Sequence, residues 1–508
     1  MFPFVGYTLA QLLHHSERTS VYSARRMGDG TAVILKLLSD EYPSAEAVAR
    51  LRREYELARK ASGHGGVTLL GLEPVRSSWA LVMEDQGARA LRSRLDGQPL
   101  PLKRVLTLGT RIATALASLH RQHIVHKDLN PSNIVISPES GEAWLIDFGL
   151  STMLSRESTG LRDPHVLEGT LRYLSPEQTG RMNRAIDYRT DLYSLGITLY
   201  ELLVGHVPFQ TADAVELVHL HIAQQPVPPH QVNPTIPRAV SDVVMKLLAK
   251  TAEERYQSAL GVKVDLERCL AHLDSPGPEP QDFSPGLEDA SDRFLLPQKL
   301  YGREAEVAAL LETFERAARG RAELLLVAGS SGVGKSVLVN ELHKPVVQRQ
   351  GTFAQGKFDQ LRRDIPHAPL VQAFNDLVRQ LLTEAPARLE HWRQRLTQTL
   401  GEKGQVLIEV LPDLERIMGP QPPVPALPPH EAQLRFHLAF QRLVQVLASA
   451  AHPLALFLDD LQWADPPSLH LIRALLTDPD CRHLLILGAY RDNELDETHP
   501  LWRTCEAL

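Results

Sequence analysis

The stretch His126-Lys127-Asp128-Leu129-Asn130-Pro131-Ser132-Asn133 decides the fold, together with Asp147-Phe148-Gly149 further along the chain. Apolar runs at 124–125 and 134–136 flank the first stretch, and another at 144–146 precedes the second, so both are predicted to lie at strand ends. Transfer of a phosphoryl group to a hydroxyl needs a proton acceptor, positioned metal ions and cations along the triphosphate. Asp128 can accept the proton, and Asn133 and Asp147 can hold Mg²⁺.

The spacing His-x-Asp-x-x-x-x-Asn followed by Asp-Phe-Gly resembles the catalytic core of the eukaryotic-type protein kinases. This resemblance implies an α+β domain over residues 7–273, with a small β-rich lobe and a larger helical lobe. It also implies that ATP and Mg²⁺ are cofactors and that a protein is the substrate. Lys36 ends a β-branched run and would contact the α- and β-phosphates. Its expected partner lies on a predicted helix at 45–61, where Glu54 fits best and Glu56 is the alternative.

Residues 80–85 are predicted to form the strand that leads into the hinge between the lobes. By the same resemblance, Met83 would lie behind the adenine pocket. The backbone from Glu84 to Gln86 would face the edge of the adenine.

Three features depart from the kinase pattern. The glycine-rich loop should have glycine at three positions, which are occupied here by His14, Ser16 and Thr19. Side chains there should hold the loop further from the phosphates. Lys127 replaces an arginine that pairs bidentately with a phosphorylated activation loop, so activity should depend little on that phosphorylation. Asn130 replaces a lysine that reaches the γ-phosphate, so stabilisation of the transition state should be reduced.

Two later motifs extend the resemblance. Ser-Pro-Glu stands where kinases have Ala-Pro-Glu, and Glu177 is expected to pair with Arg255. Asp191 matches an aspartate that braces the catalytic loop from a buried helix. The run from Gly169 to Asp191 resembles one branch in particular. It is the kinase domain at the N-terminus of multidomain hybrid sensor histidine kinases, where an ATPase, a GAF module and a histidine kinase follow.

A proline-punctuated polar segment at 274–298 is predicted to be a semi-extended linker. After it, the run at 324–328 is a predicted buried strand that leads into Gly-x-x-x-x-Gly-Lys-Ser. A strand before this motif and a helix after it are the context that a P-loop requires. The predicted nucleotide-binding residues are Gly329, Gly332, Gly334, Lys335 and Ser336, and the Ser336 hydroxyl would also ligate Mg²⁺.

Further acidic and basic residues end two later predicted strands. Asp459 would hold Mg²⁺ through water, Asp460 would polarise the attacking water, and Arg491 would sense the γ-phosphate. The surrounding motifs Leu-Asp-Asp-Leu-Gln-Trp-Ala-Asp and Gly-Lys-Phe-Asp-Gln resemble the AAA-like ATPases of the STAND signalling class. This implies an α/β P-loop NTPase domain over residues 299–508. Because STAND ATPases continue with a lid and a winged-helix element, the domain is expected to be incomplete at its C-terminus.

The composition limits the classes of function. The 508 residues carry a net charge of −7, which argues against a nucleic-acid or anionic-membrane binder driven by bulk charge. There are three cysteines, without metal-type spacing, and no apolar run is long enough to span a bilayer. A cytoplasmic location is therefore expected.

These features predict a serine/threonine protein kinase in signal transduction, joined to a STAND/AAA-like ATPase. One alternative is a pseudokinase scaffold, favoured by the missing glycines and by Asn130. In another, the ATPase is the only enzyme and acts as an oligomerisation switch through self-association. Because a proline-rich linker separates the domains, their two nucleotide sites are expected to act independently.

Overall fold

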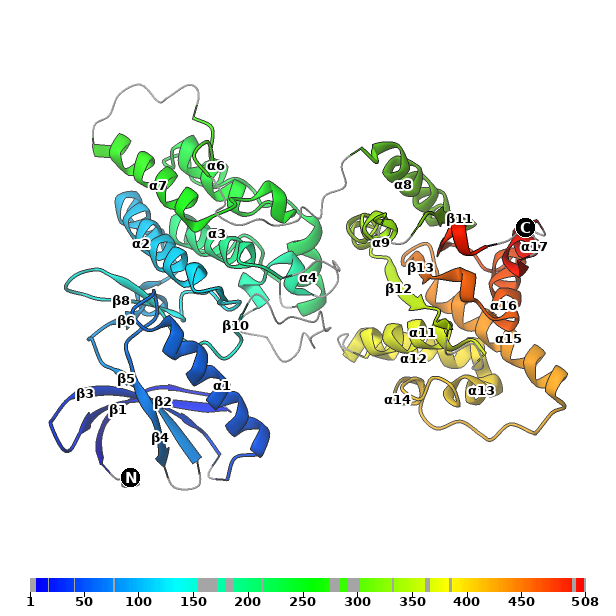
Figure 1. Cartoon of the computed structure of the whole chain (residues 1–508), viewed down its shortest axis with the longest axis horizontal. Coiled ribbons are helices and arrows are strands. Elements are labelled where there is room, and N and C mark those ends of the chain that lie inside the picture. The colour runs from blue at the N-terminus through cyan, green and yellow to red at the C-terminus, as the bar shows by residue number, and fades with distance from the viewer. Residues whose placement is uncertain are drawn as a thin grey trace.

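The computed structural model describes residues 6–16, 18–40, 42–75, 78–153, 171–179, 186–211, 213–274, 283–289, 302–330, 333–360, 366–382, 386–495 and 499–506. Within these ranges the chain forms two bodies, each with its own layers of secondary structure (Figure 1). Gly332 and residues 154–170 of the activation segment lie outside the described residues.

The first body begins with an antiparallel sheet of five strands in the order β1-β2-β3-β5-β4. Its elements are β1 (Tyr7–His15), β2 (Thr19–Arg26), β3 (Ala32–Leu38), α1 (Ala45–Ala61), β4 (Leu69–Val75) and β5 (Ser78–Glu84). Helix α1 is preceded by the cap residue Ser44, whose side chain accepts a hydrogen bond from the Ala47 amide. Capping of this kind satisfies an amide that would otherwise lack a partner. The predicted helix at 45–61 is confirmed with both of its ends.

A helical lobe follows and is built around α3 (Arg189–Val204), all of whose residues are buried. A helix that is buried on every side must be surrounded by other elements. The neighbouring helices are α2 (Leu102–Arg121), α4 (Ala214–Ala223), α5 (Pro229–Val232), α6 (Arg238–Leu247) and α7 (Ala259–Asp274). The short elements are β6 (Arg89–Ala90), η1 (Leu91–Arg94), β7 (Ile124–Val125), β8 (Ile134–Ile136), β9 (Ala143–Leu145), β10 (Thr152–Met153), η3 (Leu171–Tyr173), η4 (Pro176–Thr179) and η5 (Ala252–Glu254).

Part of the predicted linker is packed against the helical lobe. In the described residues 283–289, the Gly286 amide donates to the carboxylate of Asp265. The carboxylate of Asp289 accepts hydrogen bonds from the Gln257 amide at 2.5 Å and from the Ser258 hydroxyl at 2.8 Å. The expectation of an unpacked, semi-extended segment is therefore wrong for these residues, because their polar groups find partners on and around α7. The domain boundaries themselves remain a prediction.

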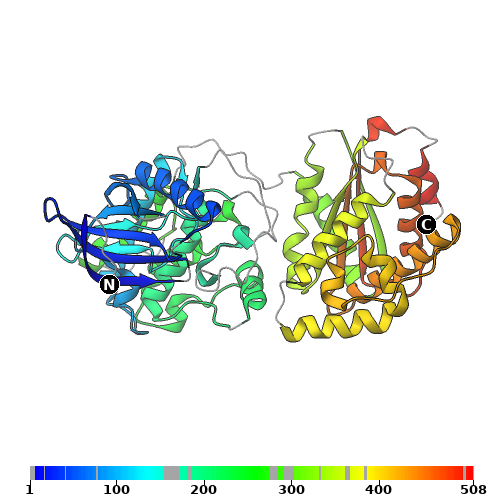
Figure 2. The ribbon, with the colours of Figure 1, turned by 90° about the horizontal axis from the view of Figure 1, so that it is seen from below.

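The second body contains a parallel sheet with the strand order β11-β14-β13-β12. The strands are β11 (Ala322–Ala328), β12 (Thr352–Lys357), β13 (Leu454–Asp459) and β14 (Leu484–Tyr490). Alternate residues of β13 enter different cores: Ala455 and Phe457 pack on one face, whereas Leu454, Leu456 and Leu458 pack on the other. Both faces of a parallel sheet are normally covered, and Figure 2 shows helices on either side of this one.

One face of this sheet is covered by α8 (Glu304–Ala318), α9 (Lys335–Asn340) and α10 (His343–Gln348). The other elements are α11 (Ala368–Leu381), α12 (Pro386–Leu400), η7 (Gly401–Lys403), α13 (Gly404–Ile408), α14 (Leu414–Met418), α15 (Pro429–Leu447), η8 (Leu461–Trp463), α16 (Pro466–Thr477), η9 (Asp492–Glu494) and α17 (Pro500–Glu506). The predicted fold class is confirmed: an α+β domain with a β-rich and a helical lobe precedes an α/β domain.

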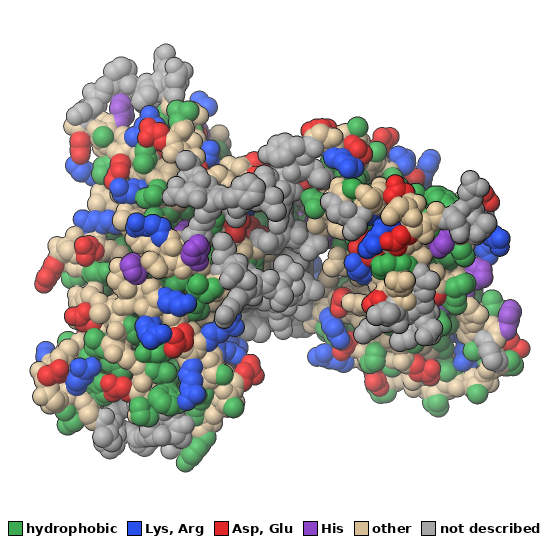
Figure 3. All heavy atoms as spheres, viewed as in Figure 1, with side chains coloured by type: hydrophobic (Ala, Val, Ile, Leu, Met, Phe, Trp, Pro, Cys, Tyr) green, Lys and Arg blue, Asp and Glu red, His purple; other side chains and the backbone are tan. Residues whose placement is uncertain are grey.

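The described surface is of mixed charge. On the face shown in Figure 3, acidic and basic side chains are interspersed over both bodies. Among the described residues, no helix combines the length and the apolarity that crossing a membrane requires.

Candidate active sites

Lys36, Glu54 and Asp147 come together where the β-rich lobe meets the helical lobe. The Lys36 ammonium, on β3, donates to Glu54 Oε1 at 2.7 Å and to Asp147 Oδ1 at 2.9 Å. Glu54 lies on the buried face of α1, whereas Glu56 pairs with Arg59 on the surface. The structure therefore selects Glu54 over the alternative Glu56.

The charges of this cluster support one another. Burial alone would lower the pKa of Lys36, but the Asp147 and Glu54 carboxylates raise it above the ordinary value. Burial would likewise raise the pKa of Asp147, and the Lys36 ammonium lowers it instead. The Asp147 side chain is still 42% exposed. It can therefore reach a ligand while it holds Lys36.

Asp128 is held by two amide side chains of its own loop. Asn133 Nδ2 donates to Asp128 Oδ2 at 2.9 Å, and Asn130 Nδ2 donates to Asp128 Oδ1 at 3.0 Å. Asn130 itself is fixed, because its Oδ1 accepts from the Ser132 amide. The sequence presented Asn130 only as the loss of a lysine. In the structure it also orients the carboxylate of Asp128.

This contact predicts a loss of turnover in Asn130→Ala. Without one of its two amide donors, Asp128 is less well oriented, so turnover in phosphotransfer should fall roughly 10-fold. The KM for ATP should stay within about two-fold, because the Asn130 side chain contacts the proton acceptor and not the nucleotide residues. Asn233→Ala, at a turn beside α5, is the control. Equal turnover in Asn130→Ala and the wild type would contradict the orienting role.

The catalytic loop is braced from beneath by Asp191, which is fully buried at the start of α3. Its carboxylate accepts hydrogen bonds from the amides of His126 at 2.9 Å and Lys127 at 2.8 Å. His120 Nε2 lies 2.9 Å away. Burial would raise the pKa of Asp191, but its bond with His120 and the loop amides lower it. The bracing role predicted for Asp191 is confirmed.

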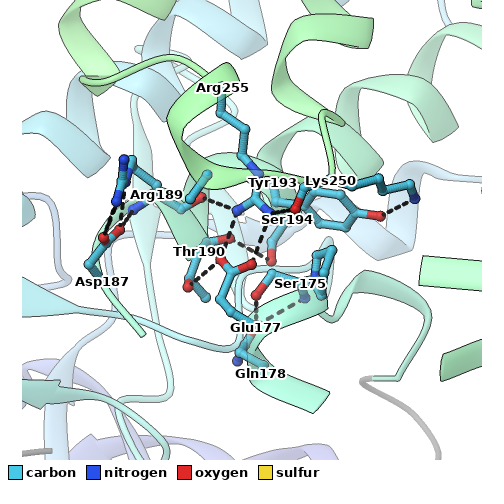
Figure 4. A network of polar contacts seen from close by, with 12 residues as sticks. Ser175, Glu177, Gln178, Asp187, Arg189, Thr190, Tyr193, Ser194, Lys250 and Arg255 are labelled. Carbon is cyan, nitrogen blue, oxygen red and sulfur yellow. Dashed lines mark hydrogen bonds and ion pairs between the residues drawn. The ribbon is translucent and has the colours of Figure 1, made fainter. Parts of the chain in front are cut away.

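Glu177 and Arg255 form a buried bidentate ion pair, as the sequence predicted (Figure 4). Arg255 Nη1 and Nη2 donate to the two carboxylate oxygens at 2.7 and 2.8 Å. The Thr190 hydroxyl donates to the same carboxylate. Burial would raise the pKa of Glu177, but the Arg255 guanidinium and these hydrogen bonds lower it to about 2.

The turn between β1 and β2 is closed without glycine. The Ser16 hydroxyl accepts a hydrogen bond from the Thr19 amide at 3.0 Å, and the Ser16 carbonyl accepts one from the Ser39 hydroxyl at 2.9 Å. The tip of this hairpin is thus fastened to the residue after β3. His14, the third substituted position, lies within β1 and pairs with Val21.

The end of β5 is fastened to both of its neighbours. The Glu84 amide donates to the Thr68 carbonyl, and the Asp85 amide donates to the Ala32 carbonyl. The Gln86 side chain bonds to Thr68 and Glu84. These bonds fix the backbone from Glu84 to Gln86, which the sequence predicts to face adenine.

In the second body the P-loop follows β11. Gly329 has φ of 150° and Gly334 has φ of 90°, conformations that glycine adopts without strain. A side chain at Gly329 would also meet the Val333 side chain at 2.9 Å. Lys335 opens α9, and its ammonium donates to the carbonyls of Gly329 at 2.6 Å and Ser330 at 2.9 Å. A phosphate would therefore have to replace these carbonyls as the partner of Lys335. Ser336 is the next residue of the helix.

Asp459 ends β13, two strands away from β11, and Asp460 directly follows it. Burial and the neighbouring Asp460 charge raise the pKa of Asp459. Burial would raise that of Asp460 too, but Gln462 and Lys357 lower it. Arg491 Nε lies 3.4 Å from Asp460 Oδ1, and Arg491 Nη1 donates to Glu494. The structure thus places Arg491 against Asp460.

Lys357 lies beside the acidic pair, a neighbour that the sequence did not single out. Its ammonium is 3.1 Å from Asp460 Oδ2 and 3.8 Å from Asp459 Oδ2. The parallel register of β12 and β13 sets Lys357 opposite Asp459. Lys357 belongs to the Gly-Lys-Phe-Asp-Gln motif, but only the pairing of the strands shows which residues it faces.

Both candidate sites offer oxygen atoms that could bind the Mg²⁺ of a nucleotide. Mg²⁺ prefers oxygen ligands, and the carboxylate of Asp147 is accessible. Because Asn133 turns its Nδ2 toward Asp128, its Oδ1 is the atom that can serve as a ligand. In the second body, the Ser336 hydroxyl and the Asp459 carboxylate supply oxygens of the same kind.

Comparison with known proteins agrees with this geometry. Residues 7–266 match the protein kinase domain family, and residues 299–487 match the AAA ATPase domain family. The kinase match covers half of the chain, so the chain belongs to the protein kinase family, with an AAA ATPase domain after the kinase domain. Protein kinase and AAA ATPase domains use ATP with Mg²⁺, which confirms the predicted cofactors.

Three relatives illustrate the kinds of protein to which the chain is similar. The chain is 39% identical over 326 residues to hybrid signal transduction histidine kinase G of Dictyostelium discoideum, an alignment that covers 60% of the chain and 9% of that protein. It is 33% identical over 264 residues to a probable serine/threonine-protein kinase of Clostridium perfringens, covering 52% and 38%. Histidine protein kinase 1 of Candida albicans is 23% identical over 509 residues, covering 92% and 20%. The resemblance to a kinase–ATPase fusion is confirmed, and the chain spans well under half of each relative's length.

Proposed function

We propose that the chain is an ATP-dependent serine/threonine protein kinase that acts in signal transduction in the cytoplasm and is coupled to a STAND-like ATPase module. The observation that carries this proposal is the position of the Lys36 ammonium, which is bound by Glu54 and Asp147 at once. An intact lysine cluster is what a working phosphotransfer site requires, and it argues against the pseudokinase scaffold.

Each residue has a proposed role in this reaction. Asp128 accepts the proton of the substrate hydroxyl, and Asn130 and Asn133 hold its carboxylate in place. Lys36 binds the α- and β-phosphates, kept in position by Glu54. Asn133 and Asp147 would hold Mg²⁺, which neutralises the charge of the phosphates when bound. Glu84 and Gln86 present backbone groups to the adenine.

Incubation of the full chain with γ-labelled ATP and a protein substrate tests the proposal. We expect label on serine or threonine, as shown by phosphoamino-acid analysis. A wild-type chain that transfers no label, while still binding nucleotide at Lys36, would favour the pseudokinase scaffold.

In the ATPase domain, we propose that Gly329, Gly332, Gly334 and Lys335 bind the phosphates. Ser336 and Asp459 would hold Mg²⁺. Asp460 would orient the attacking water and Arg491 would lie near the γ-phosphate. This assignment is supported by the glycine conformations around Lys335 and by the acidic pair at the end of β13. Self-association through this domain stays a hypothesis.

This assignment predicts different effects for two variants. Lys335→Ala should abolish binding of a fluorescent ATP analogue at the second site and retain binding at the first. Asp460→Asn should keep the nucleotide bound but lower its hydrolysis about 10²-fold, because Ser336 and Asp459 remain while the water loses its carboxylate. Equal stoichiometry of binding by Lys335→Ala and the wild type would refute the P-loop assignment.

A further inference from the structure

The ATPase domain touches the kinase domain at a defined apolar surface. Helix α10 packs against α4, and Figures 1 and 2 both show α4 on the side of the helical lobe that faces the second body. Val347 of α10 packs on a cluster of buried kinase residues. The members of this cluster, here called the α4 surface, are Leu171, Leu174, Phe209, Leu217, Val218 and Ile222.

An ion pair lies beside this apolar contact. Arg388, on α12, approaches the carboxylate of Asp213 to 3.5 Å, just before α4 begins. Both side chains are partly exposed, so the pair adds less than about 1 kcal/mol and serves mainly to orient the contact. These described contacts show that the linker does not keep the two domains apart, and the independence of their nucleotide sites stays a prediction.

On the ATPase side, α10 is joined to the P-loop through α9. Helix α9 begins at Lys335, and the Leu342 amide between the helices donates to the Val339 carbonyl. Leu338, Val339, Leu342 and Val346 pack in one core with β13 and β14. A movement of the backbone around Lys335 is therefore expected to move α9 and α10 together, including Val347 at the end of α10.

On the kinase side, α4 is joined to the segment that supports the catalytic loop. The buried Lys250 ammonium donates to the His221 carbonyl in the last turn of α4 at 2.8 Å and to the Tyr193 hydroxyl at 3.2 Å. The Arg255 guanidinium lies 4.9 Å from the centre of the Tyr193 ring and binds Glu177 (Figure 4). Lys250 thus connects α4 to the Glu177–Arg255 pair.

A shorter connection starts at Leu174, a member of the α4 surface. The next residue, Ser175, bonds through its amide and hydroxyl to Gln178 Oε1. Gln178 Nε2 donates to the Lys127 carbonyl at 2.7 Å. Lys127 directly precedes Asp128, so the α4 surface and the catalytic loop are linked by buried contacts.

We infer that the α4 surface is the docking site of α10 and that nucleotide bound at the P-loop controls the kinase domain through this contact. The inference rests on the proposed nucleotide sites of both domains. Coupling between sites is carried by packed, contiguous elements that move together. The effector is a Mg²⁺–nucleoside triphosphate or diphosphate held at Lys335.

Hydrogen exchange of the full chain tests the first part of the inference, the docking of α10 on the α4 surface. Val347→Arg places a charge against the α4 surface, whereas Gln348→Arg puts the same side chain on an exposed neighbouring position of α10. We expect amides of residues 214–223 to exchange at least about threefold faster in Val347→Arg than in Gln348→Arg or the wild type. Helix α2, more than half of whose residues are buried, serves as an internal reference. Unchanged exchange in Val347→Arg would overturn the docking.

The second part of the inference, the control by nucleotide, is tested by comparing hydrogen exchange of residues 214–223 with and without Mg²⁺–ATP. We expect nucleotide to change it in the wild type and to leave it unaltered in Lys335→Ala, which retains the first nucleotide site. An identical response in both chains, or no response in the wild type, would overturn the coupling. This readout needs no phosphotransfer. If the exchange responds to nucleotide as expected but the chain transfers no label, the proposed kinase activity is refuted and the nucleotide-controlled docking is still supported.

Discussion

Asp128→Asn is expected to lower phosphotransfer turnover by about 10²-fold or more. Asparagine cannot accept the proton of the substrate hydroxyl, and it offers one oxygen where the carboxylate receives both Asn130 and Asn133. Nucleotide affinity should change by no more than about three-fold, because the loss affects the chemical step and not ground-state binding. Labelled phosphotransfer and titration with a fluorescent ATP analogue measure the two quantities.

The matched control is Asp96→Asn, at an exposed position after η1. It makes the same chemical change away from the lysine cluster and should retain the turnover of the wild type. Thermal unfolding of both variants checks that the fold is intact. Wild-type turnover in Asp128→Asn would rule out this residue as the proton acceptor.

Arg255→Met is expected to destabilise the kinase domain by about 3–5 kcal/mol at neutral pH, since it leaves the Glu177 carboxylate buried without its cation. Arg255 is fully buried, and methionine replaces only the aliphatic part of its side chain. Arg238→Met is the control. Arg238 is 79% exposed and lies 3.9 Å from Asp242, so its loss should change the free energy of unfolding by less than about 1 kcal/mol.

The pH dependence of this difference follows from the pKa of Glu177. In the wild type this pKa is about 2, against about 4.3 in the unfolded chain. The ionised Glu177 therefore contributes its full stabilisation above the unfolded-state pKa. This contribution is lost as the pH falls toward the folded-state pKa. In Arg255→Met, burial should raise the pKa of Glu177. Acid then protonates the carboxylate and removes the cost of a buried, unpaired charge. The gap between variant and wild type in urea unfolding should therefore narrow from pH 7 to pH 4. If the difference in the free energy of unfolding stayed constant with pH, the unpaired Glu177 charge would not be its cause.

The elements of the fold were largely predictable from local patterns. The helix at 45–61 and the strands at 124–125 and 134–136 were predicted with their observed bounds, because apolar periodicity and capping residues act over a few neighbours. The strand before the predicted P-loop and the helix after it also followed from a local pattern, since glycines are needed where the chain leaves a strand and enters a helix. By contrast, the packing of residues 283–289 was not visible, because proline and polar composition does not reveal that Asp289 finds partners near α7.

The sequence by itself determined which chemical groups each site contains and the order in which they occur. It named Lys36, Asp128, Asn133 and Asp147, because spacing along one loop or strand is a local property. The tertiary structure decided which of these groups meet: Lys36 and Asp147 are 111 residues apart, yet their side chains are 2.9 Å apart. It also chose Glu54 over Glu56, brought Lys357 to Asp460 through the strand register, and placed Val347 on the α4 surface. Such contacts depend on the packing of whole elements against one another, which no local spacing encodes.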